Sequence, residues 1–283
     1  MKDSSARISL VTGATSGVGR AAATALAWQG YAVTIASRNP EKCAAVAAEL
    51  QQETGNQLVE PLGMDLGSLQ SVRTAVQEFR RRHDRLDLLV NNAGISPSRR
   101  RETRDGFEAT LGVNHLGHFL LTNLLLDLLV KSAPSRVISV SSNIYKQARL
   151  DFDDVQLRRG FSAMKAYANS KLANLLFTSE LARRLAGTGV TVNAMTPGLV
   201  KTNIGQEEGR LYAFSKRLAD FFGGKTPEQG ADTLVWLATS PDVATVNGQY
   251  FDRRKSVPLT EAAADEAAAE RLWQVSEQLV GLP

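Results

Sequence analysis

A tyrosine and a lysine four positions apart carry the most evident chemistry of this chain. Tyr167 and Lys171 stand in the stretch AYANSK, and positions i and i+4 of a helix share one face, one turn apart. We expect the lysine ammonium to favour the ionised phenol and to lower its pKa from about 10. Such a phenol can give or take a proton beside a carbonyl or alcohol. Because the pair also arises by chance on helices, its interpretation depends on three segments upstream.

The first segment is a glycine-rich turn near the N-terminus. The run 8–12 (ISLVT) predicts a strand, 13–19 (GATSGVG) a turn and 20–27 a helix. Free backbone N–H groups and the positive end of the helix dipole then meet at one point, where a pyrophosphate can bind. The alternative is a flexible surface turn, since the spacing differs from Gly-x-Gly-x-x-Gly. The residues expected to contact the dinucleotide are Gly13, Ser16, Gly17, Val18 and Gly19.

The second segment follows the predicted strand 32–36. Sites for NAD usually place an acidic residue here, whereas an arginine accommodates the 2′-phosphate of NADP. The chain has Arg38 at this point and no acid before Glu41, which predicts NADP rather than NAD. Arg20 is either a second positive charge for this site or a solvated helix charge. Asp65, followed by Leu66, either meets the adenine amino group or caps a helix.

The third segment, 91–94 (NNAG), directly follows the apolar run 86–90. In an open α/β sheet, ligands collect at the carboxyl ends of the strands. We therefore expect Asn92, Ala93 and Gly94 to lie against the cofactor.

In combination and in order, these segments resemble the short-chain dehydrogenase/reductase family over roughly residues 8 to 252. Within it, the chain is similar to the retinol dehydrogenase-like branch, which also includes relatives of the WW-domain oxidoreductase and of light-dependent protochlorophyllide reductase. That similarity lies in 112–119 (GVNHLGHF), 167–174 (YANSKLAN) and the long interval from Ser142 to Tyr167. The matching motif residues are Thr12-Gly13-x-x-x-Gly17-x-Gly19, Asn91-Asn92-Ala93-Gly94, Asn114, Ser142, Tyr167-x-x-x-Lys171 and Pro197-Gly198-x-Val200-x-Thr202.

The resemblance implies a role for each catalytic position. Tyr167 would exchange a proton with the substrate oxygen, and Lys171 would hold the nicotinamide ribose and lower the pKa of the phenol. Ser142, with Ser141 as its rival, would stabilise charge on the substrate oxygen. Asn114 would link Lys171 to water in a proton relay. The residues that would border the nicotinamide are Pro197, Gly198, Val200 and Thr202, and the two nearby histidines expected only to pack are His115 and His118.

Strands and helices alternate along the chain, which predicts an α/β fold with a parallel sheet and helices on both faces. We expect one doubly wound Rossmann domain over 1–283 with seven strands in the family's order 3-2-1-4-5-6-7. The segment 201–225 is either a mobile lid over an apolar substrate or a packed amphipathic helix. The expected strands are near 8–13, 31–36, 57–64, 86–91, 135–141, 190–196 and 247–251; the expected helices are near 17–29, 40–53, 68–82, 104–131, 163–187, 226–239 and 260–280.

Composition fits an ordinary globular protein, with 43% hydrophobic and 22% charged residues in 283. Cys43 is the single cysteine, residues 1–7 lack a signal-peptide core, and the apolar stretch 119–130 is too short to span a bilayer. We therefore expect a cytoplasmic protein without an integral membrane segment. A net charge of +4 and 6% aromatic residues do not favour nucleic-acid binding. Three histidines and one cysteine show no metal-ligand spacing.

The expected activity is NADP-dependent interconversion of an alcohol and a carbonyl on an apolar, retinoid-like or aromatic substrate. Two alternatives are a non-catalytic nucleotide-sensing scaffold and an epimerase or lyase with tightly held NAD. Relatives often pair through the helices expected at 104–131 and 163–187. The extra segment 145–162 would cover that face, so we expect a monomer or a homodimer.

Overall fold

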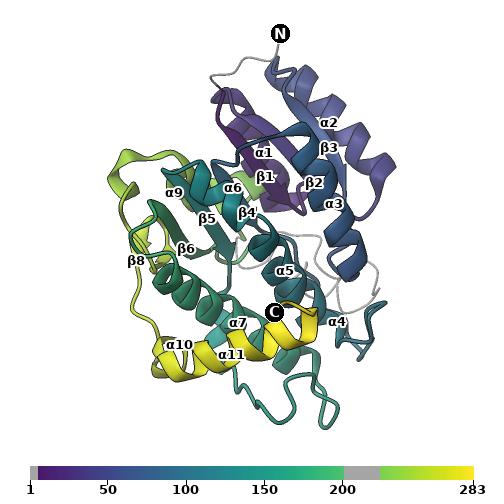
Figure 1. Cartoon of the computed structure of the whole chain (residues 1–283), viewed down its shortest axis with the longest axis vertical. Coiled ribbons are helices and arrows are strands. Elements are labelled where there is room, and N and C mark those ends of the chain that lie inside the picture. The colour runs from purple at the N-terminus through teal and green to yellow at the C-terminus, as the bar shows by residue number, and fades with distance from the viewer. Residues whose placement is uncertain (1–5, 201–223) are drawn as a thin grey trace.

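The computed structural model describes residues 6–200 and 224–283. Its centre is an eight-stranded sheet in the order β3-β2-β1-β4-β5-β6-β7-β8, with helices on both faces (Figure 1). All neighbouring strands are parallel except β7 and β8. The strands are β1 Ile8–Thr12, β2 Ala32–Ser37, β3 Val59–Gly63, β4 Leu88–Asn91, β5 Ser135–Val140, β6 Val190–Thr196, β7 Tyr250–Asp252 and β8 Lys255–Ser256.

The predicted fold class and strand order are confirmed, and the expected count of seven strands is one too low. The additional strand, β8, has two exposed residues and pairs antiparallel with β7. Arg253 and Arg254, both with positive φ, make the turn between the two strands. A two-residue polar edge strand has no hydrophobic alternation, so the sequence carries no signal for it.

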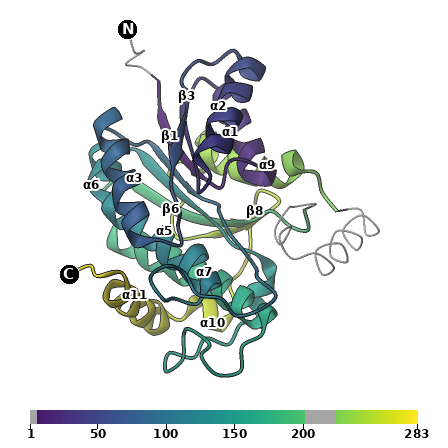
Figure 2. The same ribbon diagram turned by 90° about the vertical axis from the view of Figure 1, so that its right-hand side faces the viewer.

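The central strands are buried along their whole length because helices cover both faces of the sheet. Every residue of β4 and β6 is buried, as expected for parallel strands between two helical layers. One layer contains α1, α2 and α9, and the other contains α3, α5, α6, α7 and α11 (Figure 2). The helices are α1 Gly17–Trp28, α2 Pro40–Thr54, α3 Leu69–Arg82, α4 Ala109–Leu111, η1 Gly112–Leu116, α5 Gly117–Leu124, α6 Leu126–Lys131, η2 Asn143–Gln147, α7 Ala163–Arg184, α9 Pro227–Thr239, η4 Pro241–Val243, α10 Glu261–Ala264 and α11 Glu266–Val280.

The continuous helix expected over 104–131 is wrong. The helix begins at Ala109, contains the π turn η1 and breaks again at Leu125. Close packing fixes this irregular course. A Cβ at Gly112 would lie 2.5 Å from Thr103 Cγ2, and one at Gly117 would lie 2.4 Å from the Leu66 carbonyl oxygen. The backbone thus approaches its neighbours too closely for a side chain, which hydrophobic periodicity cannot reveal.

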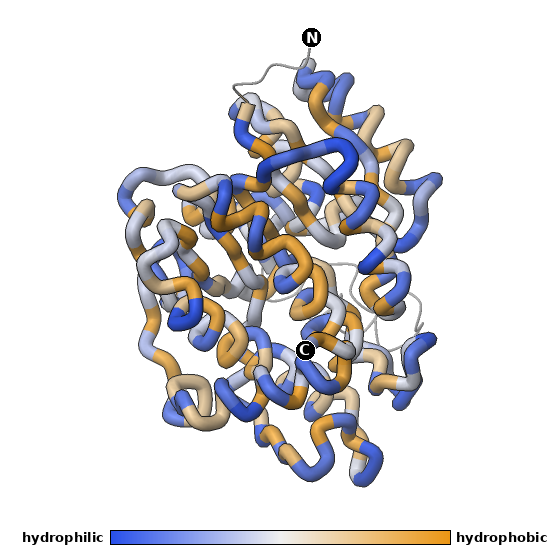
Figure 3. Tube along the Cα trace, viewed as in Figure 1, coloured by the Kyte–Doolittle hydropathy of each residue, from blue (hydrophilic) through white to orange (hydrophobic). Residues whose placement is uncertain are grey.

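The C-terminal segment packs on the outer face of α5 and α7. Trp273 of α11 is stacked on Phe177 of α7, with ring centroids 5.9 Å apart, and meets the Phe119 ring edge-on at 4.8 Å. Blue and orange positions alternate along α11 in Figure 3, as a helix with one buried face requires. Within the described residues, none of the helices combines the length and the apolarity needed to cross a membrane.

Candidate active site

The glycine turn between β1 and α1 is packed directly against the segment that follows β4. A Cβ at Gly13 would lie 2.8 Å from Ala93 Cα, and one at Gly19 would lie 2.4 Å from Asn92 Nδ2. Gly13 and Gly17 also have φ of 66° and 56°, which favours glycine. Ser16 precedes α1 without a side-chain capping bond. The first N–H groups of this helix therefore remain available for an anion.

Thr12 joins the ends of β1 and β4. Its hydroxyl oxygen accepts hydrogen bonds from the backbone N–H of Asn92 at 2.9 Å and of Ala93 at 3.0 Å. In return, the Asn92 side-chain amide donates to the Thr12 carbonyl at 2.8 Å. The structure thus places the expected cofactor residues of both segments in one rigid unit.

Tyr167 and Lys171 lie together on α7, with the Lys171 ammonium 5.4 Å from the centre of the Tyr167 ring. The Lys171 side chain donates to the Val140 carbonyl at 3.1 Å and has no carboxylate partner among the described residues. Burial raises the pKa of Tyr167 to about 12 and lowers the pKa of Lys171 to about 8. The expected lowering of the Tyr167 pKa by Lys171 is therefore wrong, because burial sets the direction of the shift.

The structure distinguishes the two serines after β5. Ser141 is buried, and its hydroxyl donates to the Lys171 carbonyl at 2.8 Å. Ser142 is half-buried, and its oxygen accepts a long bond of 3.4 Å from the Ile144 N–H. This bond leaves the Ser142 proton available, so Ser142 rather than Ser141 has a hydroxyl that can donate to a ligand.

Asn114 lies within the π turn, and its side chain is committed to structural bonds. Its amide oxygen accepts from the Ile95 N–H at 2.8 Å, and its amide nitrogen donates to the Ile95 carbonyl and to Ser170, each at 3.0 Å. These bonds leave only the Asn114 backbone carbonyl for the expected relay, and its oxygen already lies 3.1 Å from His118 Nδ1. Gly94 lies between Asn114 and Lys171. A Cβ at Gly94 would be 3.4 Å from Asn114 Oδ1 and 3.7 Å from Lys171 Nζ.

Two candidates for the nucleotide end make bonds that were not predicted. Arg20 forms an ion pair with Glu49 of α2 at 2.9 Å, so it belongs to a helix surface. Asp65 does not cap α3, because Ser68 does. The Asp65 carboxylate instead accepts from the Gly67 N–H at 2.9 Å and shapes the turn after β3. The exposed Arg38 lies just after β2, as expected.

Three neighbouring side chains at this site are largely buried by apolar packing. Leu66 lies against Gly117, where a Cβ would be 2.9 Å from Leu66 Cβ. Val18 and Val200 both pack over Gly230 of α9, where a Cβ would be 3.0 Å and 2.6 Å from their methyl groups. These residues therefore shape the site mainly through their backbone.

Beyond β6, Pro197 and Gly198 are held by a lysine that the sequence analysis did not identify. Lys225 Nζ donates to the Pro197 carbonyl at 3.3 Å and would lie 3.1 Å from a Cβ at Gly198. Val200 and Lys225 also form a parallel bridge. Thr202 and nearly all of the expected lid lie outside the described residues.

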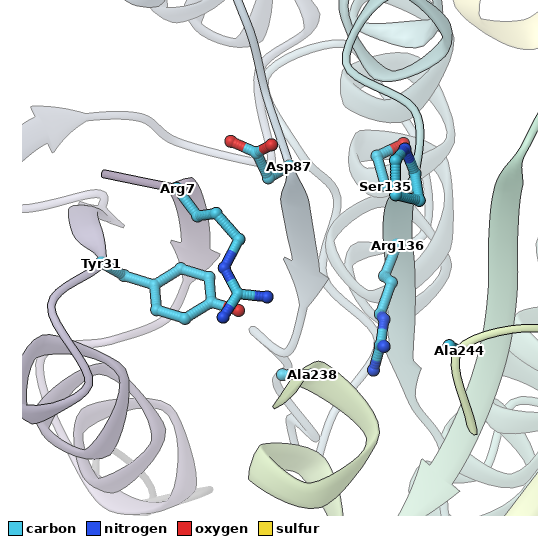
Figure 4. Close-up of a pocket in the computed structure, with 8 residues that line it drawn as sticks. Arg7, Tyr31, Asp87, Ser135, Arg136, Ala238 and Ala244 are labelled. Carbon is cyan, nitrogen blue, oxygen red and sulfur yellow. The ribbon is translucent and has the colours of Figure 1, made fainter. Parts of the chain in front are cut away.

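A cavity of about 110 Å³ lies at the opposite ends of β1, β4 and β5 (Figure 4). Its charged residues are all in structural bonds. Arg136 donates to the Leu237 and Ser240 carbonyls at 2.6 and 2.9 Å, and Asp87 accepts from the Ile8 N–H at 2.7 Å. The Arg7 guanidinium stacks 4.7 Å from the centre of the Tyr31 ring. The Arg136 bonds join β5 to the end of α9, and the Asp87 bond joins the starts of β1 and β4. We therefore do not assign this cavity to the reaction.

Comparisons with known proteins show the family of this chain. The sequence profile of the short chain dehydrogenase family matches residues 7–212. Retinol dehydrogenase 14 of Mus musculus is 45% identical, covering 96% of this chain and 85% of that protein. Human retinol dehydrogenase 13 is also 45% identical, over 96% of this chain and 84% of that protein.

Two solved structures show the same likeness. An uncharacterised protein from Mycobacterium paratuberculosis has a TM-score of 0.78 and 35% identity, covering 98% of this chain and 94% of that one. A short chain dehydrogenase from Escherichia coli CFT073, complexed with NADPH, has a TM-score of 0.71 and 29% identity, covering 87% and 95%.

Proposed function

Because this chain belongs to the short chain dehydrogenase family and is an oxidoreductase, we propose that it interconverts an alcohol and a carbonyl with NADP(H). The observation that carries this proposal is the pair on α7. Tyr167 lies beside a buried ammonium, Lys171, that has no carboxylate partner among the described residues. A lone buried cation costs stability, and such groups cluster at functional sites.

The carboxyl edge of the sheet fits a dinucleotide. Gly13 and Gly19 leave no room for side chains of their own, and the start of α1 offers N–H groups to a pyrophosphate. Arg38 would meet a 2′-phosphate. The neighbours from Escherichia coli and Pseudomonas aeruginosa are described as complexes with NADPH and NADP, which supports the phosphorylated cofactor. When bound, this cofactor supplies or receives the hydride.

The proton is handled by the residues of the chain itself. With its pKa raised to about 12 by burial, Tyr167 is protonated at neutral pH and can donate to a carbonyl oxygen. Ser142 would donate its free proton to the same oxygen and stabilise the charge that develops there. Lys171, anchored at the Val140 carbonyl, would offset the negative charge left on the phenolate.

We further propose that the substrate is apolar, in the class of retinoids or aromatic aldehydes and ketones. Met164 is 58% exposed one helical turn before Tyr167, and Leu199 is 60% exposed directly after Gly198. Apolar side chains exposed beside a reactive group favour an apolar ligand. The similarity to retinol dehydrogenases supports the same class. The segment 201–225 would then act as a lid of this single domain.

A carbonyl panel with NADPH tests both proposals. Loss of NADPH absorbance is measured with a retinoid aldehyde, an aromatic aldehyde, an aliphatic ketone and a hydrophilic sugar aldehyde as control. We expect turnover with the first three at a higher kcat/KM than with the sugar. Absence of turnover with every apolar carbonyl would refute the substrate class. NADPH that stays bound without oxidation would favour a nucleotide-sensing scaffold.

For the assembly, we propose a monomer or a homodimer. α11 already packs its aromatic residue Trp273 onto α5 and α7, and a covered helix face is not available for a second copy. Light scattering coupled to gel filtration tests this, and a stable tetramer would contradict it.

A further inference from the structure

His118 of α5 is buried and forms a hydrogen bond at each ring nitrogen. Its Nε2 lies 2.9 Å from the Thr12 hydroxyl oxygen, and its Nδ1 lies 3.1 Å from the Asn114 carbonyl oxygen. Only 3% of the residue is exposed. The imidazole therefore bridges the clamp between β1 and β4 and the π turn that carries Asn114.

The hydrogen-bond partners of His118 fix the tautomer of its ring. The Asn114 carbonyl can only accept, so Nδ1 carries the hydrogen and donates to it. Burial lowers the pKa of His118 to about 4, so the ring is neutral at pH 7 and its Nε2 is an acceptor. The Thr12 hydroxyl lies within reach of this nitrogen as a donor, and the Val90 carbonyl, 3.2 Å from the same hydroxyl, is the second acceptor for its proton.

Both ends of the bridge lead to the proposed reaction. On one side, Thr12 holds the backbone of Asn92 and Ala93, against which the glycine turn packs. On the other side, the Asn114 carbonyl belongs to the π turn. The side-chain amide of Asn114 donates a hydrogen bond to Ser170, which precedes Lys171 in the sequence. A shift of either end would change the distance between cofactor and acid.

We propose that His118 is a positioning residue that sets the cofactor clamp and the Asn114 carbonyl at a fixed distance from each other. This proposal rests on the proposed function, because its effect is felt in the hydride and proton steps. From the sequence, we expect His118 only to pack. Its two bonds to the site assign it a second role.

His115 offers a matched control in the same irregular turn. It is equally buried, and its Nε2 lies 2.8 Å from the Ser276 hydroxyl of α11. Ser276 donates to the Leu272 carbonyl at 2.7 Å, so it accepts from His115. This histidine ties the turn to the C-terminal helix and makes no hydrogen bond to Thr12, Asn92 or Lys171. Its replacement should alter stability rather than turnover.

The test compares His118→Phe, His118→Gln and His115→Phe by steady-state kinetics with NADPH and a reactive apolar aldehyde. Phenylalanine keeps the ring volume and removes both bonds. The glutamine amide carries one acceptor and one donor about as far apart as the two ring nitrogens. We expect His118→Phe to lower kcat by about 10- to 100-fold, since small misplacements at a reacting centre have effects of that size. The solvent isotope effect on kcat should rise.

His118→Gln should retain most of the wild-type kcat, and His115→Phe should lower the melting temperature while kcat stays the same. If His118→Phe does not fold, His118→Asn replaces it. Asparagine keeps a donor near the Asn114 carbonyl but is too short to reach Thr12, so an intermediate kcat is expected.

An unchanged kcat in His118→Phe, or equal losses of kcat in His118→Phe and His115→Phe, would overturn the positioning role. Wild-type protein that binds NADPH and never oxidises it would instead overturn the proposed function, so the two failures are distinguishable.

Discussion

The two ends of the central strands use their polar groups in opposite ways. At the amino end, Arg136 and Asp87 around the cavity of Figure 4 are bonded to backbone atoms of neighbouring elements. At the carboxyl end, Lys171 is buried without a carboxylate partner among the described residues, and Ser142 keeps a free proton. Gly13 and Gly19 there pack too closely on Ala93 and Asn92 to carry side chains.

This contrast shows that a hollow alone does not mark a reactive site. Charges that hold the fold are matched, because an unmatched buried charge costs stability. At the carboxyl edge, the buried Lys171 ammonium has no carboxylate among the described residues to offset that cost. Such an arrangement is expected where a ligand supplies the missing partners.

The largest effect on kcat is expected from a tyrosine-to-phenylalanine change at the carboxyl end of the strands, compared with the same change at the amino end. Tyr167→Phe removes the proposed proton donor and should lower kcat by about 1000-fold, while NADPH binding persists. Tyr31→Phe, at the cavity of the amino end, should leave kcat unchanged. Turnover and NADPH fluorescence titration measure the two quantities. Turnover retained in Tyr167→Phe would mean that another group supplies the proton.

The next effect is a gain in stability from removing the unmatched charge. Burial lowers the pKa of Lys171 from 10.5 to about 8, so between these values the unfolded chain binds one proton more than the folded chain. Stability therefore rises with pH across this window, and at neutral pH the folded protein is disfavoured by about 3 kcal/mol. Lys171→Met should be more stable by about that amount at neutral pH, with loss of activity.

Urea unfolding at several pH values measures this difference. The gain should shrink as the pH rises from about 8 to 10.5 and vanish above 10.5, where the wild-type lysine is neutral in both states. A variant that is less stable than the wild type at neutral pH would show that the ammonium is already compensated.

A smaller effect concerns cofactor choice at the nucleotide end. Arg38→Asp should weaken NADPH binding by roughly 1.5–3 kcal/mol relative to NADH, the range of a charge-assisted bond. Arg20→Gln serves as the comparison, because Arg20 is paired with Glu49. Binding of both cofactors is followed by calorimetry. An equal loss of NADPH and NADH affinity in Arg38→Asp would refute contact with the 2′-phosphate.

The smallest effect should appear at the amino end, in stability alone. Arg136→Met removes the bonds to the Leu237 and Ser240 carbonyls and should lower the free energy of unfolding by about 1–2 kcal/mol. Its kcat/KM should equal that of the wild type. A marked loss of kcat/KM in a folded Arg136→Met would show that the cavity has a functional role. It would contradict the contrast between the amino and carboxyl ends of the strands.

Sequence patterns predicted the strands of the sheet. They also predicted that Tyr167, Lys171, Ser142 and the glycine turn lie at one edge of it. These features have local signals, such as apolar runs, glycine spacing and i,i+4 pairs. The π turn at Gly112–Leu116 and the strand β8 were missed because they depend on close backbone contacts and very short pairings.

Properties of a side chain that depend on its surroundings in the folded protein could not be predicted from the sequence either. The direction of the Tyr167 pKa shift depends on burial, which the spacing of tyrosine and lysine does not report. The bond between His118 and Thr12 and the contact of Lys225 with Pro197 join residues far apart in the chain. Their partners become visible only in the folded protein.

Hydrogen exchange with and without NADPH tests most directly whether the carboxyl edge, and not the opposite cavity, holds the cofactor. The account predicts slower exchange in peptides covering 12–19, 91–95 and 167–171 and unchanged exchange around Tyr31 and in 134–136. Protection confined to the residues of the amino-end cavity, with none in the glycine turn, would contradict it.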